Sequence, residues 1–180
     1  MERLKLATVW LGGCSGCHMS FLDVDEFLID LPEYADIVFS PLIDVKRYPE
    51  GVDVALVEGA VANQEHLEMI RTVRRNTRVL ISFGDCAVTG NVTAARNSVA
   101  TALEVLERSY VEQTDTNPQI PSAAGIVPPL LDTVMPVHAV VKVDLFLPGC
   151  PPTAARIRAV LEQLVACAMP RLHGQELKFG

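Results

Sequence analysis

The stretch from Leu6 to Cys17, LATVWLGGCSGC, joins an apolar, β-branched run to a glycine-rich turn that carries two cysteines. A run of this kind bounded by glycine predicts a strand. Four similar runs follow at residues 35–39, 52–57, 79–83 and 140–147. Their hydrophobicity is nearly continuous and does not alternate, which is typical of strands in a parallel sheet that helices cover on both faces.

Segments with helical spacing separate these runs, at residues 20–29, 63–75, 94–107 and 153–168. The last begins after a pair of prolines, and its apolar face comprises Ile157, Val160, Leu161 and Leu164. The alternation predicts an α/β fold, namely a flavodoxin-like, doubly wound, mainly parallel sheet with helices on both faces in three layers. We expect residues 112–136, with five prolines, to be irregular and to have a functional partner.

Length and composition favour a single domain over residues 1–180, because 49% hydrophobic content is enough for one core. The formal charge of −7 and the small basic cluster Arg71, Arg74 and Arg75 argue against nucleic-acid binding. We also expect no membrane span, because every apolar stretch is too short or interrupted, and no export signal. These features together predict a cytoplasmic protein.

Four of the five cysteines follow a predicted strand: Cys14, Cys17, Cys86 and Cys150. Ligand sites in open α/β sheets lie at the carboxyl ends of the strands, so we expect these cysteines to converge. Structural disulfides are not expected in a reducing cytoplasm. Four thiolates suit either an iron–sulfur cluster or a tetrahedral zinc ion, and spacing alone does not separate the two metals.

The cysteines also have other interpretations. A thioredoxin-like C-x-x-C pair would explain the strand–turn–helix around Cys14 and Cys17, but not the other two cysteines at strand ends. Cys167 shares a helical face with Leu164, so we expect it in the core as a small hydrophobic residue. A flavodoxin-like fold also allows FMN on this chain, although few hydroxyls lie near the first turn to bind its phosphate.

Four segments, taken in order, carry a resemblance to a known family: Gly-Gly-Cys-Ser-Gly-Cys at 12–17, Val-Glu-Gly-Ala at 57–60, Gly-Asp-Cys-Ala at 84–87 and Leu-Pro-Gly-Cys-Pro-Pro at 147–152. Together they resemble the small subunit of nickel-iron hydrogenases, and this short form is similar to the bidirectional, NAD-reducing soluble type. The resemblance implies one proximal 4Fe-4S cluster, held by Cys14, Cys17, Cys86 and Cys150.

The implied function is electron transfer within a hydrogenase complex. Hydrogen would be split at the nickel-iron centre of a large subunit, so no catalytic residue is expected on this chain. The cluster would pass electrons to diaphorase subunits with FMN and iron–sulfur clusters, which reduce NAD. In the reverse reaction, NADH would drive the reduction of protons. Longer family members hold two further clusters, but only Cys167 remains here, so one cluster is expected.

Two alternatives remain open. The related quinone-reductase subunit of complex I usually has adjacent cysteines at the first site, whereas Cys14 and Cys17 are separated. A complex-I-like quinone or ferredoxin-linked oxidoreductase subunit with the same cluster therefore ranks second. The other alternative is an FMN- or zinc-binding flavodoxin-like module without redox iron.

Other residues are candidates by position. Glu58 follows a predicted strand at the same sheet edge. It either carries protons or lies at a subunit interface, or it is an ordinary exposed carboxylate at a strand end. Asp85 directly precedes Cys86, and its position suits the capping of a turn equally well. We expect His18 to be half-exposed near a helix start. Trp10 either shields the cluster, contacts a partner or packs in the core. We expect another subunit to cover the apolar loop at 118–136.

Overall fold

The computed structural model describes residues 3–179, and its main sheet has five parallel strands. The strands are β1 (Leu4–Trp10), β2 (Ala35–Phe39), β3 (Val52–Glu58), β5 (Thr77–Phe83) and β7 (Leu145–Leu147). Their spatial order is β2-β1-β3-β5-β7, which is the flavodoxin-like order 2-1-3-4-5 when the five are counted along the chain. The predicted fold class is confirmed.

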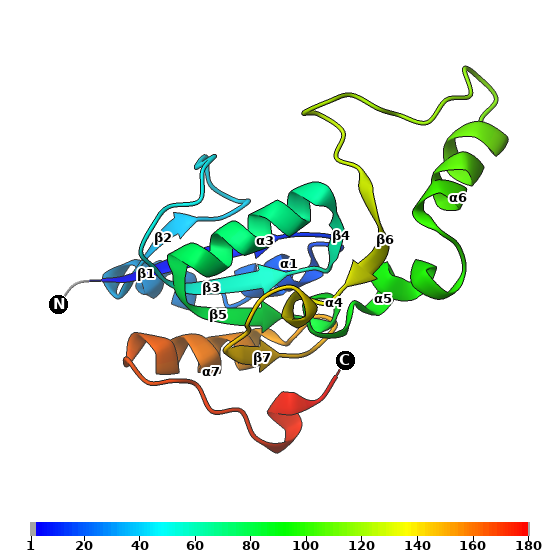
Figure 1. The fold of residues 1–180 in the computed structure, drawn as a ribbon. Helices are drawn as coiled ribbons and strands as arrows, with labels where there is room; N and C mark the ends of the chain where they lie inside the picture. Colours follow the sequence, from blue (N-terminus) through cyan, green and yellow to red (C-terminus); the bar gives the residue numbers. More distant parts are fainter. Residues whose placement is uncertain (1–2, 180) are drawn as a thin grey trace.

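Helices cover both faces of this sheet (Figure 1). One face packs against α1 (Gly16–Leu22), α2 (Phe27–Asp30) and α7 (Ala154–Val165), and the other against α3 (Gln64–Asn76) and α4 (Asp85–Thr89). Because neighbouring residues of a strand point to opposite faces, β3 contributes Leu56 to the first core and Val57 to the second. The sheet is therefore buried on both sides, as the continuous apolar runs predicted.

The helix predicted at 94–107 is broken. Its residues fall into α5 (Asn91–Ala94), the 3-10 turn Ala95–Ser98 and α6 (Ala102–Glu107), which continues into a π-helical turn at Arg108–Glu112. Thr101 starts α6 afresh with a capping box, in which Glu104 accepts a hydrogen bond from the Thr101 N–H at 2.7 Å. Neither of the two cores of the main sheet includes a residue of this helix. Leu103 in α6 is 56% exposed, and Val99, which precedes the helix, is 83% exposed.

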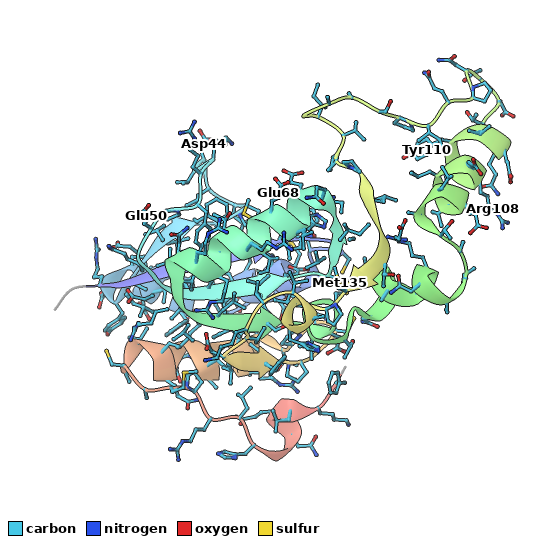
Figure 2. All side chains as sticks on the ribbon, in the orientation of Figure 1. Asp44, Glu50, Glu68, Arg108, Tyr110 and Met135 are labelled. Atoms are coloured by element: carbon cyan, nitrogen blue, oxygen red, sulfur yellow. The ribbon has the colours of Figure 1, made fainter. Side chains whose placement is uncertain are left out.

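The segment predicted to be irregular at 112–136 ends in a strand. β6 (Leu130–Met135) pairs antiparallel with β4 (Val61–Asn63) in a second, two-stranded sheet. We call residues 99–129 the arm, because α6 and the chain that follows it project away from the main sheet (Figure 1). Figure 2 shows Arg108 and Tyr110 at the α6 side of the arm, remote from the five strands.

Other predicted boundaries also change. The helix predicted at 20–29 is split, because α1 ends at Leu22 and Asp25 has a positive φ of 51° before α2 begins. Of the run at 140–147 only the last three residues form β7, preceded by a 3-10 turn at Val137–Ala139. A final 3-10 turn lies at Gly174–Leu177. Among residues 3–179, none of the helices has the length and apolar character needed to cross a membrane.

Candidate metal centre

Turns after β1, β5 and β7 bring four cysteines to the carboxyl edge of the sheet. Cys14 and Cys17 lie in the turn and first residues of α1, Cys86 lies in α4, and Cys150 follows β7. The turns are in close contact, since a Cβ built on Gly84 would lie 2.1 Å from the Cys17 Sγ. Only glycine fits at this position, where φ is +82°. The predicted convergence of the strand ends is therefore present.

The thiols influence one another electrostatically. Burial raises the pKa of the Cys17 thiol, and the negative charges of Glu58, Cys86, Cys14 and Cys150 raise it further. Burial also raises the pKa of Cys86, with hydrogen bonds from Thr93 acting against it and with Cys150 and Cys14 adding to it. A thiol-rich site of this kind favours thiolates only when a metal supplies positive charge, because metal ligation deprotonates thiols.

Asp85 joins the two turns that carry Cys86 and Cys150. Its carboxylate accepts a hydrogen bond from the Gly149 N–H at 2.6 Å, and its own N–H donates to the Gly149 carbonyl at 2.9 Å. Asp85 therefore caps a turn, which is one of the roles that its position predicted. The pair of bonds fixes the spacing of two strand ends that lie 64 residues apart in the chain.

Glu58 and His18 form a buried pair beside the C-x-x-C turn, each only 2% exposed. The Glu58 carboxylate accepts hydrogen bonds from the backbone N–H groups of His18 at 2.9 Å and Cys17 at 3.4 Å, and it contacts the His18 Nδ1. The prediction of a half-exposed His18 is wrong, because the residue lies in the interior, where Glu58 accepts a hydrogen bond from its backbone N–H and contacts its Nδ1. Its Nε2 is also buried and has no hydrogen-bond partner among residues 3–179. Glu58 likewise is not an ordinary exposed carboxylate.

The remaining candidates have different positions. Trp10 is 48% exposed and its indole N–H donates to the Gly13 carbonyl at 3.1 Å, so it is not a core residue. Cys167 is exposed and lines a cavity with Leu4 and Arg78 at the opposite edge of the sheet. Our prediction that it packs in the core is wrong, because α7 ends at Val165 and the chain turns away before Cys167.

Sequence reasoning missed Asn91, whose side-chain Nδ2 lies 3.5 Å from the Cys150 Sγ. The signal available was its place directly after Gly90, at the end of the helix that carries Cys86. The donor set fits an iron–sulfur cluster, in which each iron takes one thiolate. Within residues 3–179, no three Cys, His, Asp or Glu side chains converge on a single-ion position.

The fold and the site define a class of protein: a flavodoxin-like α/β chain with a four-cysteine centre at the carboxyl edge of its sheet. Residues 14–164 match the family model described as NADH ubiquinone oxidoreductase, 20 Kd subunit. The chain belongs to this family. The matched region contains all four cysteines of the site.

Comparison with known proteins narrows the relationship to hydrogenases. The chain is 43% identical over 169 residues to the NAD-reducing hydrogenase HoxS subunit delta of Cupriavidus necator, covering 91% of this chain and 79% of that subunit. It is 39% identical over 158 residues to a subunit of the F420-non-reducing hydrogenase of Methanothermobacter thermautotrophicus, covering 84% of this chain and 50% of the other. A crystal structure of an NAD+-reducing [NiFe]-hydrogenase in the H2-reduced state superposes with a TM-score of 0.93 at 38% identity, covering 99% of this chain and 100% of the other. The chain is thus homologous to the small subunit of NAD-reducing nickel-iron hydrogenases, as its motifs predicted.

Proposed function

We propose that this chain is the electron-transferring small subunit of an NAD-reducing nickel-iron hydrogenase, and that it holds one 4Fe-4S cluster through Cys14, Cys17, Cys86 and Cys150. The observation that supports the proposal is that these four cysteines come from three separate strand ends and lie close enough for the charges of the other three to act on Cys17. Homology to the hydrogenase subunit supports the assignment. When bound, such a cluster accepts and donates single electrons.

The chain's own residues hold and shield this site. Cys17 and Cys86 are buried whereas Cys14 and Cys150 are exposed, so one side of the centre faces the protein interior and the other faces the surface. Electrons would enter or leave through the exposed side. Because Glu58 is buried and bonded to the backbone of the C-x-x-C turn, we infer that it positions Cys17 and does not contact a partner.

A large subunit with a nickel-iron centre is the partner that this function requires, and diaphorase subunits with FMN and iron–sulfur clusters would complete the transfer to NAD. We infer that the arm docks one of these partners, the large subunit. Exposed apolar side chains on it include Leu103, Tyr110 and Ile126. Leu103 and Tyr110 line a groove of about 480 Å³ between the α6 side of the arm and residues 120–132, and Ile126 lines a second groove beside α3. An apolar surface of this kind is typical of a subunit interface.

The test is metal and sulfide analysis of the anaerobically purified protein, with EPR spectra before and after dithionite. We expect close to four irons and four sulfides for each chain and a signal that appears on reduction. Cys86→Ala should lower the iron content, whereas Cys167→Ala, the matched control at the far edge of the sheet, should not. Zinc without sulfide, or bound flavin without iron, would contradict the proposal, as would equal losses from both variants.

A further inference from the structure

The turn Gly90–Asn91 connects α4, which carries Cys86, to α5, and its backbone is unusual. Gly90 and Asn91 both have positive φ, at 88° and 35°. Side-chain-bearing residues rarely adopt such angles, and asparagine is one of the few that tolerate them. The two residues reverse the chain direction just after α4, which brings the Asn91 side chain to Cys150, 59 residues away in sequence.

The Asn91 amide nitrogen lies 3.5 Å from the Cys150 Sγ, within range for a hydrogen bond to sulfur. An amide nitrogen only donates, whereas a thiolate only accepts, so this orientation is the favourable one once Cys150 binds iron. The opposite orientation would place the amide oxygen against a negatively charged sulfur. The contact therefore has a defined polarity, from Asn91 to Cys150.

Glycine would satisfy the backbone at position 91 at least as well as asparagine, because it has no Cβ and adopts positive φ readily. It would not supply the amide. Asn91 is exposed, and its backbone N–H contacts the Thr89 hydroxyl at 3.3 Å, a bond that any residue at this position can make. What distinguishes asparagine here is thus the donor that it presents to the ligand sulfur.

We propose that Asn91 sets the reduction potential of the cluster by donating a hydrogen bond to the Cys150 thiolate. The inference rests on the proposed function, since it needs the cluster to be bound at these cysteines. Reduction adds negative charge to the cluster and its sulfurs, and a donor stabilises that charge more in the reduced state. The Asn91 amide therefore raises the potential, while the Glu58 carboxylate near Cys17 acts in the opposite direction.

Two substitutions separate this role from a structural one. Asn91→Gly keeps the positive φ and removes the donor, and Asn91→Asp keeps the size and places a carboxylate against the sulfur. Asn117→Gly is the matched control, because Asn117 also has positive φ, at 50°, but lies exposed on the arm. The readout is a potentiometric titration of the cluster followed by EPR, with iron and sulfide measured on the same samples.

We expect a negative shift of the midpoint potential for Asn91→Gly, a larger one for Asn91→Asp, and none for Asn117→Gly, with iron and sulfide unchanged throughout. The shift corresponds to as much as about a tenfold change in the ratio of reduced to oxidised cluster at a fixed potential, or about 59 mV for one electron. Wild-type potentials in both Asn91 variants would overturn the inference alone. Loss of iron from both, with Asn117→Gly intact, would assign Asn91 a structural role and also overturn it. Absence of iron and sulfide from the wild-type protein would instead refute the proposed function.

Discussion

Replacing Glu58 with glutamine tests whether the buried carboxylate holds the C-x-x-C turn in place. The carboxylate accepts hydrogen bonds from the His18 N–H at 2.9 Å and the Cys17 N–H at 3.4 Å, and its Oε2 also contacts the His18 ring. Glutamine has nearly the same shape but only one acceptor oxygen, and its nitrogen only donates. At least one buried donor would then face another donor.

An unsatisfied buried donor costs about 1 to 3 kcal/mol, so we expect Glu58→Gln to lower the free energy of unfolding by about 2 kcal/mol. Urea denaturation followed by circular dichroism measures this change, and the slope with denaturant should stay the same. The control is Glu68→Gln. Glu68 lies on the exposed side of α3, where it accepts a hydrogen bond from Gln64 at 3.1 Å (Figure 2).

Glu68→Gln should change the free energy of unfolding by less than about 0.5 kcal/mol, as is usual for surface substitutions. If Glu58→Gln has an equally small effect, the carboxylate does not hold the turn, and the reasoning from its hydrogen bonds is refuted. A change near 2 kcal/mol together with a lower iron content would support a positioning role for Glu58 toward Cys17.

Three further outcomes are expected. Asp144→Asn should lower the free energy of unfolding by about 2 kcal/mol at neutral pH, because the carboxylate accepts a charged hydrogen bond from Arg74 at 2.6 Å. Burial acts to raise the pKa of Asp144, but hydrogen bonds and nearby cations lower it overall. The carboxylate therefore stabilises the fold fully above about pH 4, and this stabilisation disappears as the pH falls through the lowered pKa. A difference in free energy of unfolding between the two proteins that persists at pH 1 in urea titrations would contradict this. Gly84→Ala should reduce iron content because its Cβ would lie 2.1 Å from a ligand sulfur, whereas Gly125→Ala, at a similar φ in open space, should keep the iron, and equal iron contents would count against the packing argument. Leu103→Asp should weaken co-purification of the large subunit without loss of iron, and undiminished co-purification would exclude the arm from that interface.

The sequence alone determined the sheet and the place of the cysteines. Long apolar, β-branched runs that end in glycine specify buried parallel strands, and an open sheet of such strands has its ligand site at the carboxyl ends. The turns that carry the four cysteines therefore lie at one edge of the sheet, and α7 buries the four apolar residues that helical spacing selected. These features depend on local pattern and on a topology with few alternatives.

Only the tertiary structure decided which polar groups are buried and where helices stop. Helical periodicity does not reveal that α7 ends at Val165, so Cys167 was predicted in the core although it is exposed. Nor does it show what covers a face, so the apolar residues of α6 were not recognised as part of a projecting arm. Buried His18 contacts Glu58, which lies 40 positions away in the sequence. Asn91 contacts Cys150, which lies 59 positions away. Such contacts form only when separate strand ends are brought to one edge of the sheet, because the partner of each polar group lies far away in the sequence.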